Sequence, residues 1–131
     1  MLQDKGKTLI VTTDEHGKDE IEKIQSLGKE VLLVQKGKDG RVALRPLMKA
    51  LVERGIASVL VEGGAEVVTS LLRENFVNRM VIIISPLILG KGIEAIGDLG
   101  IVELQRAMRP SSYEIKRIGE DVVFDLRLSV S

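Results

Sequence analysis

Three consecutive residues, Glu62, Gly63 and Gly64, have types and spacing that could bind a ligand. Paired glycines let the backbone adopt positive φ and let a ligand approach without a Cβ in the way. Glu62 places a carboxylate at the carboxyl end of a predicted strand, which is where open α/β sheets bind their ligands. A phosphate is the group that such a turn suits best when a helix follows it.

The elements that position this turn can be predicted from the flanking residues. The run Ala57–Val61 is short, apolar and rich in β-branched residues, which indicates a strand. Apolar residues then recur at helical spacing, which indicates a helix whose N-terminus points unpaired N–H groups at the turn; they are Val67, Val68, Leu71 and Leu72. Because the full GxGxxG pattern is absent, a plain βα turn with a solvated Glu62 explains the same residues equally well.

Two other loops carry polar groups at the ends of predicted buried strands. Thr12–Asp14 ends the run Thr8–Thr13 and either caps the next helix or contacts a ribose or phosphate. Lys36–Gly40 follows the run Val31–Gln35 and is either a solvated turn or a source of a cation for a 2′-phosphate. His16, the only histidine, is expected to be an exposed loop residue without a catalytic role, because no partner for a triad stands near it.

Composition excludes several classes of function. With 131 residues, 44% of them apolar and 29% charged, the chain can form one globular domain with one core. Zero net charge and 2% aromatic residues argue against a nucleic-acid surface. The absence of cysteine removes disulfides and thiolate zinc sites, and the carboxylates do not cluster at ligand spacing, so no metal site is expected. Without an apolar run of membrane length or a signal-like segment, the expected location is the cytoplasm.

The first half of the chain alternates strands with helices. Helices are predicted over Lys18–Leu27 and Leu44–Arg54, each followed by a glycine that stops it, Gly28 and Gly55. Strands that alternate with helices through short loops predict an α/β fold with a mostly parallel sheet flanked by helices.

The second half of the chain changes character and ends in an antiparallel hairpin. An apolar strand is predicted at Arg79–Ser85. Two further strands, Tyr113–Ile118 and Val122–Leu128, are separated by Gly119-Glu120-Asp121, which predicts the hairpin. Along the last strand two sets of side chains alternate, so one face of it is expected to be in water. The side chains expected on that face are Val123, Asp125, Arg127 and Ser129.

Four segments in this order resemble the reductase of riboflavin biosynthesis, the C-terminal half of the bifunctional deaminase–reductase. They are Val59–Ala65 (VLVEGGA), the helix-to-strand connection Leu71–Arg79, Ile84–Gly90 (ISPLILG) and Ile118–Val122 (IGEDV). The resemblance covers nearly the whole chain and implies a dihydrofolate-reductase-like fold.

The resemblance also implies an activity and a set of contacts. The family reduces the ribosyl group of 5-amino-6-(5-phosphoribosylamino)uracil to ribityl with hydride from NADPH. Glu62 would accept hydrogen bonds from the phosphoribosyl part of that substrate, and the strand-end loop would lie beside the adenosine end of the cofactor. No catalytic side chain is implied. The implied cofactor-binding residues are Gly63, Gly64, Ala65, Glu66, Val67, Val68, Thr69, Ser70, Lys36 and Gly37.

The family domain is longer at its front than this chain. We therefore expect residues 1–131 to form a single, N-terminally short reductase-like domain. The chain is then a fragment of a longer reductase, a naturally short protein completed by a partner, or a relic that binds a nucleotide without catalysis. An open sheet edge invites pairing, so a homodimer is expected. The alternative functions are a non-catalytic nucleotide-binding or oligomerisation module, and a related dihydrofolate-reductase-type enzyme with another substrate.

Overall fold

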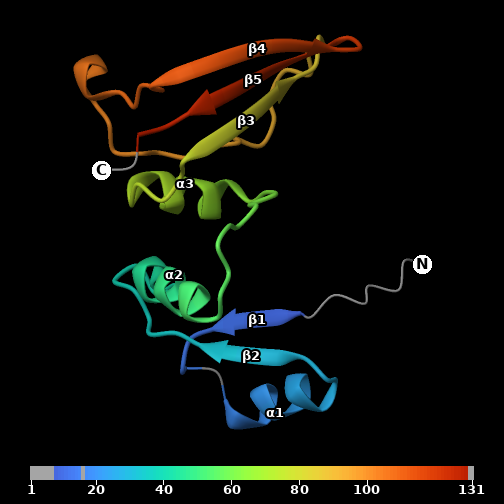
Figure 1. Cartoon of the computed structure of the whole chain (residues 1–131), viewed down its shortest axis with the longest axis vertical. Helices are drawn as coiled ribbons and strands as arrows, with labels where there is room; N and C mark the ends of the chain where they lie inside the picture. Colours follow the sequence, from blue (N-terminus) through green and yellow to red (C-terminus); the bar gives the residue numbers. More distant parts are fainter. Residues whose placement is uncertain (1–7, 16, 130–131) are drawn as a thin grey trace. The chain divides into compact units, whose positions relative to one another are not determined.

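The computed structural model describes residues 8–15 and 17–129 (Figure 1). The chain divides into two compact units, Met1–Val59 and Leu60–Ser131, and each is described by itself. Within the described ranges, no helix has both the length and the apolar character needed to cross a membrane.

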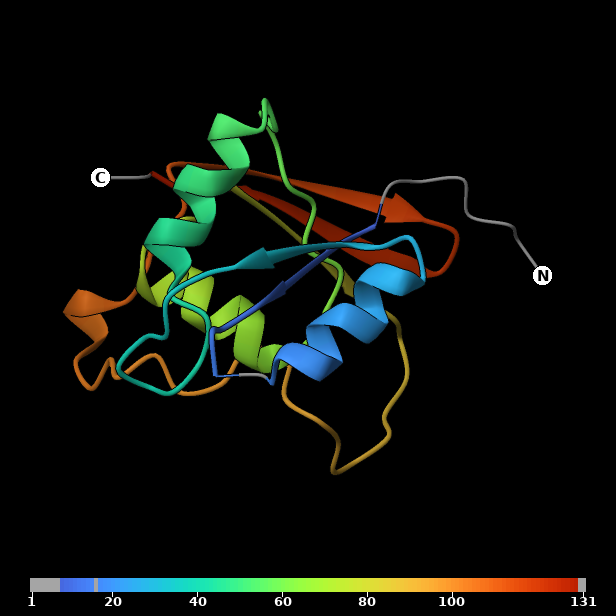
Figure 2. The ribbon, with the colours of Figure 1, turned by 90° about the horizontal axis from the view of Figure 1, so that it is seen from below.

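The first unit contains a strand–helix–strand motif followed by a second helix. Strands β1 (Leu9–Thr12) and β2 (Glu30–Leu33) pair in parallel along their whole length. The connecting helix α1 (Lys18–Ser26) packs against β2 (Figure 2), and α2 (Leu44–Glu53) follows after a loop. The parallel pairing and both helices of this half were predicted from the alternation of apolar segments, and that prediction is confirmed.

The ends of α1 and α2 also follow the sequence prediction. Gly28 and Gly55 adopt φ of +72° and +77° directly after the last turn of each helix, a conformation that glycine adopts without a Cβ penalty. Both strands were predicted to be buried, and this prediction is only partly correct. β1 is half-buried, and the ends of β2 are exposed. In a sheet of two strands both strands are edges, so the apolar runs are not covered on all sides.

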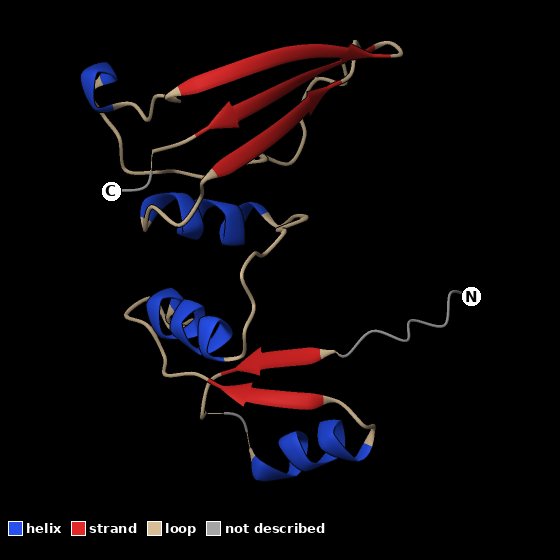
Figure 3. Cartoon of the chain, viewed as in Figure 1, coloured by secondary structure: helices blue, strands red, loops and turns tan. Residues whose placement is uncertain are grey.

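The strand predicted at Ala57–Val61 is wrong. Residues 56–64 form a loop (Figure 3) in which Leu60 is 82% exposed. β-Branched residues favour extended backbone, but a strand also needs a neighbour for its N–H and C=O groups. Among the strands that the structure describes, none pairs with this segment. Glu62 therefore stands on a loop and not at the end of a strand.

The second unit contains a three-stranded antiparallel sheet. Its strands are β3 (Arg79–Ile84), β4 (Ser112–Ile118) and β5 (Asp121–Arg127), in the order β3-β5-β4. The predicted hairpin of β4 and β5 is confirmed, and Gly119 at φ +61° opens its two-residue turn. A short 3₁₀ helix, η1 (Leu104–Arg106), lies in the long connection between β3 and β4.

The buried side chains of this unit come from α3 (Ala65–Arg73) and from β5. Leu71 and Leu72 are buried on the helix, and Val123 is 8% exposed on the strand. The prediction that Val123 and its alternate neighbours face water is wrong at this position and at Asp125, whose side chain is 14% exposed. The reason is that β5 is the central strand, so side chains of both β3 and β4 flank these positions on the same face of the sheet.

A two-point ion pair joins β3 to β5 across the sheet. The guanidinium of Arg79 donates to Asp125 through Nε to Oδ1 at 2.8 Å and through Nη2 to Oδ2 at 2.6 Å. These hydrogen bonds lower the pKa of Asp125 from its ordinary value and raise the pKa of Arg79. The planar guanidinium of arginine matches a carboxylate in this two-point geometry. The pair therefore also favours the observed register of β3 against β5.

This ion pair should make stability depend on pH in acid. A carboxyl group with a lowered pKa contributes stability above its ordinary value of about 3.9, and that contribution is lost as the pH falls through the lowered pKa. We expect Asp125→Asn to be less stable than the unsubstituted chain at pH 7, with the difference shrinking towards pH 2. Urea unfolding at a series of pH values measures it. Glu120→Gln in the hairpin turn changes the same charge as a control, and a difference for Asp125→Asn that stayed constant with pH would contradict the expectation.

Candidate functional site

The predicted glycine turn lies at the N-terminus of α3. Gly63 and Gly64 have φ of +135° and +83°, and Gly64 is the residue that precedes the helix, without a side-chain cap. The N–H of Val68 donates to the carbonyl of Gly64 at 3.0 Å, which is the first bond of the helix. Helix geometry therefore leaves the first-turn N–H groups, such as that of Ala65, without an acceptor inside the helix.

The space in front of this turn is open. A Cβ built on Gly63 would meet no atom within 4 Å, and one built on Gly64 would meet only the Cγ2 of Val67, at 3.8 Å. A ligand can therefore approach the backbone closely, and the positive end of the helix favours an anion. The exposed carboxylate of Glu62 lies next to the turn and offers only acceptor oxygens, which suits hydroxyl groups.

The following helical turn presents its side chains unequally. Val67 is exposed, whereas Val68 and Ser70 are half-buried. The hydroxyl of Ser70 donates to the carbonyl of Glu66 at 2.9 Å. Thr69 is buried, and its hydroxyl is held between two backbone groups of the chain itself. The side chain that this turn offers most openly to a ligand is therefore Val67.

The basic loop after β2 is a closed turn. The N–H of Gly37 donates to the carbonyl of Arg41 at 2.6 Å, and a Cβ on Gly37 would lie 3.0 Å from Oδ1 of Asp39. The ammonium of Lys36 forms an ion pair with Glu15 at 2.7 Å. A phosphate at Lys36 would thus replace an existing carboxylate partner, at small cost because the pair is exposed to solvent.

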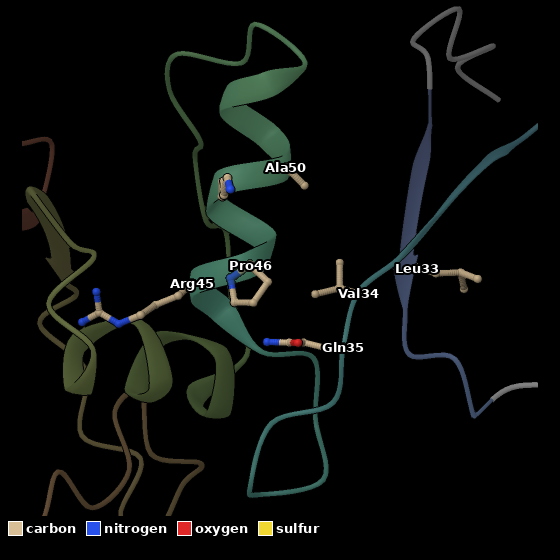
Figure 4. Close-up of a pocket in the computed structure, with 7 residues that line it drawn as sticks. Leu33, Val34, Gln35, Arg45, Pro46 and Ala50 are labelled. Carbon is tan, nitrogen blue, oxygen red and sulfur yellow. The ribbon is translucent and has the colours of Figure 1, made fainter.

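An open pocket of about 480 Å³ lies between the end of β2 and the first turns of α2 (Figure 4). Val34 and Pro46 point towards one another across it, whereas Arg45 extends from the other side of the helix. The pocket has apolar walls with polar ends, a composition typical of small-molecule sites. Its lining residues are Leu33, Val34, Gln35, Arg45, Pro46, Lys49 and Ala50.

The predicted residues fall into two groups. Glu62 to Ser70 lie together in the second unit because they are contiguous, and Lys36 and Gly37 lie in the first unit beside the pocket residue Gln35. The pocket residues of α2 were not predicted from the sequence. The sequence held one signal for them: Arg45 and Lys49 are two cations in the first turns of a helix that follows the end of a strand. Cations at such positions are more often solvated.

The suggestion that Thr12–Asp14 caps α1 is wrong, because the residue before the helix is Gly17 and no side chain caps it. His16 lies outside the described residues. Among residues 8–15 and 17–129, no three or more histidine, aspartate or glutamate side chains gather as a possible metal site.

In a mixed α/β chain, an open glycine turn at a helix N-terminus offers a position at which a phosphate could bind. Sequence comparison makes the class specific. The RibD C-terminal domain family matches residues 1–124. The chain belongs to this family.

Named relatives agree with the family match. The riboflavin biosynthesis protein RibD of Aquifex aeolicus is 36% identical over 116 residues, which cover 88% of this chain and 30% of that protein. The 2,5-diamino-6-ribosylamino-4(3H)-pyrimidinone 5′-phosphate reductase of the same organism is 39% identical over 83 residues, covering 63% of this chain and 36% of that protein. The chain thus spans about a third of the length of these curated relatives.

Solved structures give the same fold. The riboflavin biosynthesis reductase Rib7 of Saccharomyces cerevisiae superposes with a TM-score of 0.68 at 26% identity, over 95% of this chain and 52% of that one. RibD of Acinetobacter baumannii has a TM-score of 0.72 at 18% identity, over 92% of this chain and 31% of that one. The dihydrofolate-reductase-like fold predicted from the sequence is confirmed.

Proposed function

We propose that this chain is the reductase part of a riboflavin-biosynthesis enzyme, with NADPH as its cofactor and a phosphoribosylaminopyrimidine as its substrate. The observation that carries the proposal is the family match over residues 1–124, which includes the open glycine turn at the start of α3. The name of the Aquifex aeolicus pyrimidinone phosphate reductase supports this substrate class.

The cofactor would supply a hydride, and a proton would come from solvent, so that the ribosyl group becomes ribityl. In this proposal the backbone N–H groups at the start of α3 hold the pyrophosphate, and Gly63 and Gly64 keep the approach to them open. Val67, the exposed side chain of the next helical turn, lines the same cofactor. The chain then contributes binding and orientation, which can lower a barrier by several kcal/mol without an acid–base pair.

The test of this proposal is a titration of the purified chain with NADPH, with NADH as the comparison, by calorimetry. Binding that prefers NADPH, followed by turnover when the aminopyrimidine phosphate is added, is the expected result. A folded chain that binds neither nucleotide would overturn the proposal. Binding without turnover would instead favour the non-catalytic nucleotide-binding module, which is the alternative to an enzyme.

Glu62 provides a second test, directed at the substrate. Glu62→Gln keeps the shape of the side chain and removes its charge, so it should weaken substrate use roughly tenfold while NADPH affinity stays within about twofold, the size expected for losing a charge-assisted hydrogen bond. Steady-state kinetics together with the NADPH titration measure both effects. The matched control is Glu103→Gln, which removes the same charge at an exposed position of the same unit. Equal losses of NADPH and substrate affinity in Glu62→Gln would show that Glu62 is structural.

Three further expectations stay predictions. They are the homodimer, the single domain and the cytoplasmic location. All seven residues of β4 are exposed, and β4 is an edge of its sheet, which supports pairing with a second copy. The family match crosses the boundary between the two units, which supports one domain. Light scattering of the purified chain would measure its mass in solution.

A further inference from the structure

Thr69 connects α3 to a segment that lies 28 residues further along the chain. Its hydroxyl donates to the carbonyl of Ala65 at 2.5 Å and accepts the N–H of Gly97 at 2.7 Å. The side chain is 6% exposed, so water competes little for these bonds. A bond from a helix back to its own first turn is common for threonine, but here the same oxygen also holds a distant loop.

These hydrogen bonds of Thr69 connect the loop to α3, and we call such a connection a tie. A second tie lies one turn further along the helix. The guanidinium of Arg73 donates to the carbonyl of Asp98, and the carboxylate of Asp98 accepts the N–H of Gly100 at 2.7 Å. A Cβ on Gly97 would lie 3.3 Å from Oγ1 of Thr69, so the fit at the first tie depends on glycine. Residues 97–100 are therefore fastened to α3 at two points.

The part of the loop before these ties is open. Leu87, Ile88 and Ile93 are among its most exposed side chains. The loop leaves β3 at Ser85, and Gly97 lies further along it, where its N–H reaches Thr69 of the helix. Thr69 and Arg73 therefore hold residues 97–100, the part of the loop after this open stretch, to α3.

We propose that Thr69 is a positioning residue for the cofactor phosphate: by tying Gly97 to the carbonyl of Ala65, it holds the first turn of α3 in the conformation that binds. The inference rests on the proposed function. A hydroxyl that accepts the N–H of Gly97 becomes a stronger donor to Ala65, because successive hydrogen bonds polarise one another. The peptide that carries this carbonyl belongs to the turn whose N–H groups face the phosphate. The buried hydroxyl acts through the backbone and does not touch the cofactor.

The first experiment compares Thr69→Val with Thr69→Ser in the full chain. Valine has the shape of threonine without the hydroxyl, whereas serine keeps the hydroxyl. NADPH affinity is measured by calorimetry, and hydrogen exchange at Gly97 and Gly100 reports on the tie. Thr69→Val should bind NADPH roughly three- to tenfold more weakly, the effect of about one hydrogen bond, and should exchange faster in the loop. Thr69→Ser should stay within about twofold of the unsubstituted chain in both measurements.

Arg73→Met tests whether Thr69 acts through the connection to the loop or by touching the cofactor directly. Arg73 stands a full helical turn beyond Thr69, and its substitution leaves every hydrogen bond of Thr69 in place. If the ties position the first turn, Arg73→Met weakens NADPH binding in the same direction, and the effects of Thr69→Val and Arg73→Met do not add. Ser70→Ala removes a helix back-bond of the same kind and should leave loop exchange unchanged.

Two outcomes would overturn the inference while the proposed function stands. One is unchanged NADPH affinity in Thr69→Val despite faster exchange at Gly97, which would mean that the tie only orders the loop. The other is a Thr69→Ser variant that is as weak as Thr69→Val, which would remove the hydroxyl as the cause. If the unsubstituted chain binds no NADPH, the proposed function and this inference fail together, and the exchange data still show whether the tie exists.

Discussion

Gly64→Val should reduce NADPH affinity about 100-fold or more while the chain still folds. At φ +83° a β-branched residue is strained, so the start of α3 must shift, and the added side chain fills the space through which a phosphate reaches the backbone. Loss of two hydrogen bonds to a charged group, each worth about 1.5–3 kcal/mol, accounts for an effect of this size. Calorimetric titration with NADPH measures the affinity, and circular dichroism shows whether the helices remain.

Gly90→Val is the matched control for this substitution. Gly90 has φ +78°, close to that of Gly64, and a Cβ there would meet no atom within 4 Å. Both variants should lose about 1–3 kcal/mol of unfolding free energy from backbone strain, but only Gly64→Val should lose the cofactor. A folded Gly64→Val protein with undiminished NADPH affinity would contradict the proposed phosphate site.

Leu72→Ala should have the largest effect on stability, lowering the free energy of unfolding by about 2–4 kcal/mol. Leu72 is 4% exposed and is one of the few buried apolar side chains of the unit that holds α3. Removing three of its side-chain carbons leaves a cavity that the short helix cannot close by a small shift. Urea unfolding followed by circular dichroism measures the change.

The control for Leu72→Ala is an equal truncation at the surface. Leu104 in η1 is 79% exposed, and Leu104→Ala should change the free energy of unfolding by no more than about 0.5 kcal/mol. If Leu72→Ala and Leu104→Ala lower the free energy of unfolding equally, Leu72 is not part of a stabilising core. Since Leu72 also anchors the helix that would hold the cofactor, NADPH should raise the unfolding midpoint of both variants.

The elements predicted correctly are those specified by neighbouring residues. The helix that became α3 was predicted from Val67, Val68, Leu71 and Leu72, whose spacing places them on one face. The β4–β5 hairpin was predicted because a short glycine turn brings its strands together without any other part of the chain. Gly63-Gly64 was placed at a helix N-terminus for the same reason, since a turn and the helix after it are adjacent in sequence.

The features that the sequence did not reveal depend on distant partners. Ala57–Val61 has the composition of a strand, but whether it pairs depends on which strand lies beside it. Val123 and Asp125 follow the alternation of a face exposed to water, yet side chains of β3 and β4 flank them on that face. The hydrogen bond to Thr69 comes from the backbone N–H of Gly97, a group that every residue except proline has, so the sequence does not reveal this contact.

The central strand of the three-stranded sheet is also the last of its strands in the sequence. During synthesis β3 emerges first and has no partner in the sheet until residues 121–127 have been made. At roughly 5–20 residues per second, that interval lasts a few seconds, during which the edge of an apolar strand is open to chaperones or to other nascent chains. The parallel pair β1–β2 has a shorter delay, because its second strand is complete at residue 33.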